Sequence, residues 1–121
     1  GSGAGGGIAA GSVFFLKAEM IKGTDYIFSI NGIEDKIKKA DLIITGEGKT
    51  DIQSKEGKVV YSLYEKSLGK PFIAFTGVNE IKDSPFKIVE VNKKGESLKK
   101  SIRNTKKNLE EAIYNYFLSI K

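Results

Sequence analysis

Acidic, basic and hydroxyl side chains cluster in the middle of the chain, directly after a short apolar run. The stretch at residues 44–58 reads ITGEGKTDIQSKEGK. Glu47 and Asp51 lie close together in it, and carboxylate oxygens are the ligands that Mg²⁺ prefers in proteins. Lys49 and Lys58 would balance the negative charge of a bound phosphate. These groups suit phosphoryl transfer, in which catalysis consists mostly of positioning and charge stabilisation.

Glycines in the same stretch would let a bound anion approach the backbone closely. The amides of Gly46, Gly48 and Gly57 have no side chain to obstruct them. A helix that begins near Gly57 would add its first N–H groups to such a site. A loop rich in Glu, Lys, Asp and Ser can equally be a solvated surface loop, and the residue types alone do not separate these interpretations.

The glycine-rich N-terminus is a second candidate for an anion site. The chain opens with GSGAGGG and then becomes apolar. Gly1, Gly3 and Gly6 fit the pattern G-x-G-x-x-G, but no strand precedes them, so the context of a dinucleotide-binding motif is missing. A glycine-rich turn into a helix can still hold an anion, or it can allow helices to pack closely.

Composition excludes several classes of function. A chain of 121 residues suits one domain with a real core. It contains neither cysteine nor histidine, which excludes disulfides, thiolate zinc sites and a histidine base. Chemistry must therefore use carboxylates, lysines, hydroxyls and backbone amides. No apolar run approaches the roughly 18 residues of a membrane span, and no signal-peptide pattern is present. We expect a cytoplasmic protein without a membrane partner.

The net charge of +5 raises the question of nucleic-acid binding. The lysines are scattered in short pairs, however, and Arg103 is the only arginine. Arginine is the usual residue for reading bases and gripping phosphates. We therefore expect a solvated, lysine-rich surface and no nucleic-acid partner.

Apolar segments alternate along the chain in a way that predicts an α/β fold. Apolar runs predict strands at residues 40–48, 70–77 and 86–91. Helices are predicted at residues 8–20, 57–69 and 97–121. The stretch at residues 24–41 fits both an alternating strand pattern and a helical spacing. Strands separated by helix-length segments favour a parallel sheet with right-handed crossovers.

The predicted elements differ in the burial that we expect of them. The helix at residues 8–20 is apolar on most sides and should be buried, and the strand at residues 40–48 should be covered on both faces. The third strand alternates and should lie nearer an edge. One helical face contains Val60, Leu63, Tyr64 and Leu68. We expect a single C-terminal amphipathic helix, capped by Ser97, with an apolar stripe of Leu98, Ile102, Leu109, Ile113, Tyr116, Phe117 and Ile120.

The two strongest predicted strands end in the same Thr-Gly pair. Thr45-Gly46 closes the first strand and Thr76-Gly77 closes the second. Ligands of parallel sheets bind outside the carboxyl ends of the strands. Gly77 by itself indicates only a tight turn, whereas the density of polar residues after Gly46 favours a site in that loop.

The order of these segments resembles that of a known family. A GAGGG loop opens a helix, ADLIITGEGKTDIQSKEGK follows at residues 40–58, and GKPFIAFTG at residues 69–77. The combination resembles the C-terminal third of the bacterial glycerate kinase family (type I, glycerate 2-kinase). That family carries a GAGAAGG-like loop, a signature close to ADLVITGEGRxDxQTxxGK and a strand of the KPVIALAG kind. Lys49 replaces the family's arginine and Ser54 its threonine, and the lysine weakens any two-oxygen grip.

The resemblance implies ATP- and Mg²⁺-dependent phosphorylation of D-glycerate to a phosphoglycerate. It assigns catalytic roles to Glu47, Asp51 and Lys49, with Glu47 and Asp51 holding the metal or accepting the substrate's hydroxyl proton. The substrate-binding positions that it implies are Thr45, Gly46, Gly48, Gln53, Ser54, Gly57 and Lys58. The implied phosphate loop consists of Gly3, Gly5, Gly6 and Gly7.

The resemblance also implies a place for the chain in a larger two-domain kinase fold. Residues 1–32 would be the tail of a second, inserted domain, and residues 33–121 the C-terminal half of a Rossmann-like domain with a parallel sheet and flanking helices. Members of the family are much longer than this chain, so we expect the isolated chain to be inactive. Whether 2- or 3-phosphoglycerate would be the product stays open.

Two other functions fit the residues. A non-catalytic α/β fragment, or one subunit of a split enzyme, would expose an unpaired strand edge and an apolar face. Such a chain should form homo-oligomers or associate with the missing remainder of the enzyme. A small basic protein that binds anions or nucleotides, unrelated to kinases, is the third interpretation.

Overall fold

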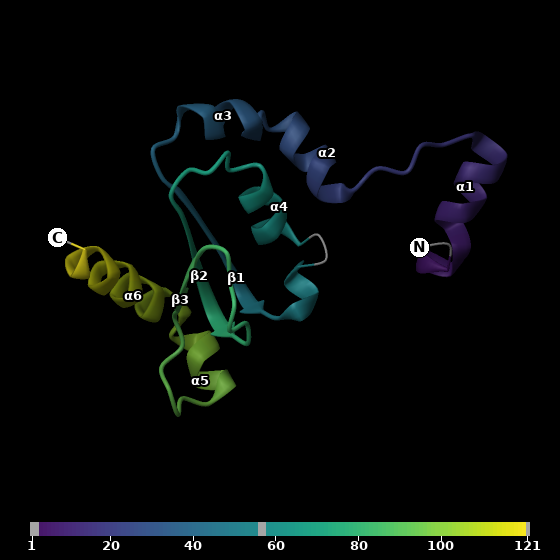
Figure 1. Ribbon diagram of the computed structural model, residues 1–121. Coiled ribbons are helices and arrows are strands. Elements are labelled where there is room, and N and C mark those ends of the chain that lie inside the picture. Colours follow the sequence, from purple (N-terminus) through teal and green to yellow (C-terminus); the bar gives the residue numbers. More distant parts are fainter. Residues whose placement is uncertain (1–2, 56–57, 121) are drawn as a thin grey trace. The chain divides into compact units, whose positions relative to one another are not determined.

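A computed structural model describes residues 3–55 and 58–120, with the backbone alone for residues 53 and 55. The helical elements are η1 (Ala4–Gly7), α1 (Ile8–Leu16), α2 (Gly23–Ile30), α3 (Ile33–Lys39), η2 (Ile52–Lys55), α4 (Val59–Glu65), α5 (Leu98–Arg103) and α6 (Thr105–Ser119). The strands are β1 (Ile43–Thr50), β2 (Phe72–Asn79) and β3 (Lys87–Glu90) (Figure 1). The chain forms two compact units, residues 1–33 and 34–121, and each is described by itself.

The first unit differs from expectation because α1 is exposed. None of its residues is buried, and Phe15 is 78% exposed. Its apolar side chains point in all directions, so one neighbouring element could not cover them, and residues 3–33 contain no sheet. The helix ends at Leu16, earlier than predicted, because Lys17 adopts the left-handed conformation with φ +56°.

The ambiguous stretch at residues 24–41 is helical. It forms α2 and α3, and the strand-like alternation of its apolar residues was misleading. Gly32 separates the two helices with φ +58°, a conformation that glycine adopts without strain. Thr24 does not cap α2, since Lys22 occupies the N-cap position.

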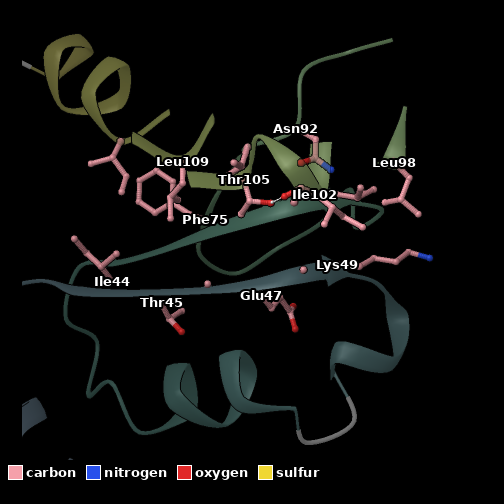
Figure 2. Close-up of a pocket in the computed structure, with 16 residues that line it drawn as sticks. Ile44, Thr45, Glu47, Lys49, Phe75, Asn92, Leu98, Ile102, Thr105 and Leu109 are labelled. Atoms are coloured by element: carbon pink, nitrogen blue, oxygen red, sulfur yellow. Dashed lines mark hydrogen bonds between the residues drawn. The ribbon is translucent and has the colours of Figure 1, made fainter. Parts of the chain in front are cut away.

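The second unit confirms the predicted parallel α/β architecture. The strand order is β1-β2-β3, and both neighbouring pairs are parallel. The helix α4 lies on one side of the sheet, and α5 and α6 lie on the other (Figure 2). The strand β3 occupies an edge, as its alternating sequence indicated, and residues 72–76 of the central strand β2 are all buried.

Two apolar layers hold the helices on the sheet. On one face Ile73, Phe75 and Val91 are buried under α6, where Tyr116 and Phe117 pack against them. The other face carries an aromatic cluster of Tyr61, Tyr64, Phe72 and Phe86, with neighbouring ring centroids 4.9–5.4 Å apart. Leu68 was expected in this layer but is exposed, because α4 ends at Glu65 and Leu68 lies in the turn that follows.

The strand β1 is longer and less covered than predicted. It continues to Thr50, two residues beyond the predicted end at residue 48, and η2 follows closely. Its burial alternates, with Ile43 and Thr50 buried and Ile44 50% exposed. The prediction of coverage on both faces is wrong for this chain, because the face that carries Ile44 lines an open groove beside α5 and α6.

Glycine is required where β1 and β2 approach each other. A Cβ at Gly46 would lie 2.7 Å from the carbonyl oxygen of Phe75, and one at Gly77 would lie 2.5 Å from the carbonyl oxygen of Gly48. A Cβ at Gly48, by contrast, would meet no atom within 4 Å. Gly46 and Gly77 therefore serve strand pairing, although both were interpreted as turn or loop residues.

The C-terminal helix is interrupted, which corrects the prediction of one long helix. Asn104 lies between α5 and α6, with ψ near 4°. The carboxylate of Glu96 accepts hydrogen bonds of 3.0 Å from the side chains of Ser101, Asn104 and Asn108. Leu98 and Ile102 of the predicted stripe are consequently exposed on α5, whereas Leu109 and Ile113 of α6 pack on the core. Ser97 occupies the N-cap position but makes no side-chain cap hydrogen bond.

Replacing Gly46 should test the close approach of β1 and β2. We expect Gly46→Ala to lower the free energy of unfolding by about 1–3 kcal/mol, because the new methyl group displaces the Phe75 carbonyl. Gly48→Ala is the matched control, and it should be neutral or stabilising by about 0.4–1 kcal/mol, because the space is open. Urea unfolding of both variants measures the difference. Equal stabilities would contradict the steric explanation.

Replacing Glu96 should remove a pH-dependent part of the stability. The hydrogen bond from Asn104, with those from Asn108 and Ser101, holds the pKa of Glu96 below its usual value of 4.5 despite its burial. A lowered folded-state pKa means that the ionised group stabilises the fold above pH 4.5, and that this stabilisation is lost as the pH falls through the lowered pKa.

We therefore expect Glu96→Gln to unfold at a lower urea concentration than the parent at neutral pH. The gap between variant and parent should narrow in acid, where the parent's carboxylate is protonated. Glu110→Gln, at an exposed position of α6, is the control and should track the parent at every pH. A gap that is constant with pH would rule out the charge of Glu96 as the source.

Candidate active site

Several polar side chains from the segment 44–58 lie around the carboxylate of Asp51, at the point where β1 ends. Its Oδ1 accepts hydrogen bonds from the Ser54 backbone N–H at 3.2 Å and from Lys58 Nζ at 3.4 Å. Lys49 Nζ lies 3.9 Å from Oδ2 of the same carboxylate and 2.9 Å from Glu80 Oε1. The turn from β1 into η2 and α4 thus brings Lys49, Asp51, Ser54 and Lys58 together, as the sequence indicated.

The acidic and basic side chains in this cluster stabilise one another's charged forms. Burial alone would raise the pKa of Asp51, but the hydrogen bond and charge of Lys58, helped by Ser54 and Lys49, lower it overall. The hydrogen bond to Glu80 raises the pKa of Lys49. Asp51 therefore stays ionised and Lys49 stays protonated near neutral pH. Glu80, which follows β2, was not among the predicted site residues.

Ser54 is part of the local scaffold. It is fully buried, and its hydroxyl accepts a hydrogen bond of 3.1 Å from the Asp51 backbone N–H. The same hydroxyl lies 3.4 Å from both Asp51 Oδ1 and Lys58 Nζ. These contacts close the turn on itself and fix the direction of the Asp51 carboxylate. Gly57 and the side chain of Gln53 lie outside the described residues.

Glu47 is connected to two buried threonines. Thr50 Oγ1 donates a hydrogen bond of 2.8 Å to Glu47 Oε1 and lies 3.0 Å from Thr76 Oγ1. Thr76 Oγ1 lies 2.9 Å from the carbonyl oxygen of Val78. Both threonines are fully buried. The register of the sheet creates this chain, because it pairs Glu47 with Thr76.

A buried hydroxyl from α4 adds to this side of the sheet. Tyr61 is 8% exposed, and its hydroxyl makes no hydrogen bond to any described residue. Burial raises the pKa of Tyr61, and the charge of Glu47 raises it further, while the neighbouring Ser84 hydroxyl offsets part of the rise. A neutral phenol close to Glu47 is therefore a feature of the site that the sequence did not predict.

The opposite side of β1 is apolar and hollowed. The side chains of Thr45 and Glu47 point away from it, on the α4 side of the strand (Figure 2). A groove of about 780 Å³ lies between the sheet and helices α5 and α6. Its lining includes Ile44, Gly46, Gly48, Lys49, Phe75, Gly77, Asn92, Leu98, Ile102, Thr105, Leu109 and Ile113. We call this the glycine-floored groove.

The N-terminal glycines belong to the first unit. Gly5, Gly6 and Gly7 all have positive φ angles, of +59°, +69° and +86°, and they lead directly into α1. Gly3 precedes them in an open position. Three consecutive left-handed residues require glycine, so conformation alone explains their presence.

Metal ligands are sparse in the described part of the chain. No group of three or more Asp, Glu, His or Cys side chains there is arranged to hold a metal ion. Glu47 and Asp51 have different hydrogen-bond partners, Thr50 for Glu47, and Ser54 and Lys58 for Asp51. In the same described part, every helix is too short or too polar to cross a membrane.

Sequence reasoning missed Thr50, Glu80 and Asn92. Thr50 could have been found, because T-G-E-G-K-T alternates polar and glycine residues and so continues the strand pattern of period two. Glu80 and Asn92 follow other strands, and only the strand register brings them near β1. Nothing in their local sequence marks them.

Known proteins resemble the whole chain. The model of the Glycerate kinase family matches residues 1–121. A glycerate kinase of Neisseria meningitidis is 33% identical over 122 residues, which cover 95% of this chain and 33% of that protein. A glycerate kinase of Halalkalibacterium halodurans and a glycerate 2-kinase of Escherichia coli are each 38% identical over 79 residues, covering 64% of this chain and 21% of the relative.

These similarities agree with the resemblance seen in the signature of residues 40–58. The chain spans a third or less of the length of these relatives. Since the family model covers every residue of the chain, the chain belongs to the glycerate kinase family.

Proposed function

We propose that the protein transfers a phosphoryl group from ATP to D-glycerate, giving a phosphoglycerate, and that this chain supplies one part of the site. The observation that carries the proposal is the match of the whole chain to the glycerate kinase family. The polar cluster at the carboxyl end of β1 supports it, because ligands of parallel sheets bind there.

The two carboxylates take different roles in this proposal. Asp51 Oδ1 is already occupied by Ser54 and Lys58, so Asp51 organises the lysines. Glu47 shares one oxygen with Thr50, and in Figure 2 its side chain projects from β1 on the α4 side. Glu47 is therefore our candidate for the group that accepts the proton of the substrate hydroxyl.

The threonine chain would accommodate that proton. Three contacts link Glu47, Thr50, Thr76 and the Val78 carbonyl, and the two hydroxyls supply only two protons. When Glu47 accepts a proton it can donate to Thr50, Thr50 can donate to Thr76, and Thr76 can donate to Val78. Every contact is then paired, so proton uptake does not disrupt the buried network.

The lysines and a magnesium ion would handle the phosphate charge. Lys49 and Lys58 are 50% and 43% exposed at their side chains, so both can reach a ligand. Mg²⁺ is usually held by one or two carboxylates together with substrate phosphates and water. The two carboxylates of Glu47 and Asp51 fit that requirement, and the ion would neutralise charge on the transferred phosphoryl group.

In the longer protein, the chain would supply parts of two domains. Residues 1–32 would be the tail of a second domain, with Gly3, Gly5, Gly6 and Gly7 as a phosphate loop, and residues 33–121 half of a Rossmann-like domain. Gly46, Gly48, Gly57, Gln53 and Thr45 would contact one of the two substrates, ATP or D-glycerate, through backbone or side-chain atoms. We propose a cytoplasmic enzyme.

One observation favours a second candidate, a subunit that needs a partner chain. The edge strand β1 leaves Ile44 50% exposed, and Leu98 and Ile102 on α5 are 69% and 66% exposed. An unpaired edge beside an apolar surface favours association. Light scattering combined with size-exclusion chromatography separates the two: a monomer that phosphorylates D-glycerate excludes the partner-dependent form.

Substitution of the two carboxylates tests the proposed roles. In the full-length protein, Glu47→Gln should lower the kcat for D-glycerate phosphorylation by about 10²–10⁴-fold, because the proton acceptor is lost. Asp51→Asn should also remove most activity, since Lys49 and Lys58 lose their shared anchor. Coupled assays of ADP release measure both, and Glu110→Gln on α6 serves as the exposed control.

The outcomes are distinct for the two residues. Activity of Asp51→Asn within a few-fold of the parent would sink its assignment, provided that circular dichroism shows an unchanged fold. A pH–rate profile separates Glu47 from a structural role, because losing a general base removes one limb of the profile. An unchanged profile for Glu47→Gln would exclude it as the base.

A further inference from the structure

The glycine-floored groove lies across β1 from Glu47, and its lining includes Gly46, Gly48 and Lys49 of the residues assigned above. We propose that it binds the adenosine part of the nucleotide, with the phosphates passing the end of β1 toward Lys49 and Lys58. This inference rests on the proposed function, because it assumes that the ligand of the Asp51 cluster is a nucleoside phosphate.

The floor of the groove suits a flat ring. Gly46 and Gly48 of β1 and Gly77 of β2 all line it, and none of them projects a side chain. The register pairs Gly46, in the middle of β1, with Phe75, while Gly48 and Gly77 lie in the carboxyl-terminal halves of the neighbouring parallel strands. Bare backbone over such an area lets a planar group approach the sheet closely.

The walls of the groove are apolar and belong to helices. Leu98 and Ile102 come from α5, and Leu109 and Ile113 come from α6 (Figure 2). A volume of about 780 Å³ lies within the usual range of small-molecule sites. Apolar walls over a flat floor favour a stacked aromatic ring more than a sugar acid such as D-glycerate, which has no apolar surface.

A single amide in the groove offers the polar recognition that a purine needs. Asn92 lines it, and its Nδ2 would lie 3.5 Å from a Cβ built on Gly77. Its side chain makes no hydrogen bond to any other described residue. An Asn amide offers a donor and an acceptor side by side, which matches the N6 and N7 edge of adenine.

Charge at one end of the groove fits a phosphate chain that follows the base. Lys49 both lines the groove and contacts Asp51, so it links the apolar site to the polar cluster. Lys58 stands on the far side of the same carboxylate. With Asp51 and Glu80 also present, this end suits phosphates that carry a divalent cation better than a bare anion.

The test uses the full-length protein and compares the affinities of adenosine, ATP and D-glycerate by calorimetry. Gly48→Val should fill the groove, because a side chain there points into open space and valine suits a strand. We expect the affinity for adenosine and for ATP to fall by about tenfold or more relative to the parent, which corresponds to about 1.4 kcal/mol or more. D-glycerate binding should not change. Tyr114→Ala, on an exposed part of α6 outside the groove, is the control.

A second variant keeps the proposal testable if Gly48→Val fails to fold. Asn92→Leu preserves size but removes the amide. The parent should prefer adenosine to purine riboside, which lacks the 6-amino group, and Asn92→Leu should abolish this preference. Retention of the preference in the variant would overturn the role of Asn92 and with it the placement of the base.

The remaining outcomes distinguish this inference from the proposed function. If folded Gly48→Val binds adenosine as the parent does, the groove is not the adenosine site. The same result is expected if another segment of the longer protein fills the groove, and it overturns the proposal in that case too. If the protein phosphorylates D-glycerate but its KM for ATP is unchanged in Gly48→Val, the proposed function is supported and the proposed adenosine site is overturned. If adenosine binds in the groove but the protein does not phosphorylate D-glycerate, the adenosine site is supported and the proposed kinase function is overturned.

Discussion

The close approach of β1 and β2 is the constraint on which the rest of the second unit depends. The two strands can pair as they do only because Gly46 faces the Phe75 carbonyl and Gly77 faces the Gly48 carbonyl. That pairing places Thr76 beside Glu47, which completes the threonine chain on one face. It also leaves the opposite face bare, which creates the floor of the groove. One steric requirement therefore produces both halves of the candidate site.

Period-two alternation in a single strand separates two kinds of chemistry. Thr45 and Glu47 project toward α4, where hydroxyls and charges surround them, while Ile44 and the glycines face α5 and α6 (Figure 2). An edge strand can do this because neither face is fully committed to the core. Lys49, at the end of the strand, contacts both environments. Substrates bound on the two faces would meet at this point.

Much of the second unit could be predicted from the sequence, because strong local signals agreed with one another. Buried runs such as FIAF predicted strand β2, and the density of polar residues after Gly46 indicated the segment in which Asp51 and Lys58 form an ion pair. The predictions failed where tertiary context decided. The break at Asn104 depends on Glu96, a residue that precedes the helix, and the exposure of α1 depends on which layers its unit provides. Thr50, Ser54 and Thr76 are residue types that usually lie at the surface, and only their hydrogen-bond partners show why these three are buried.

The anchoring of α5 by Glu96 has a mechanical consequence. The Glu96 carboxylate accepts hydrogen bonds from side chains on both sides of the Asn104 break and so helps to hold α5 against α6. The Thr105 hydroxyl of α6 adds contacts to the Ser101 and Ile102 carbonyl oxygens of α5. Leu98 and Ile102, which form one wall of the groove, lie on α5. The width of the groove therefore depends in part on Glu96, a residue that does not line it. Loss of this carboxylate would thereby alter access to the cavity from outside its walls.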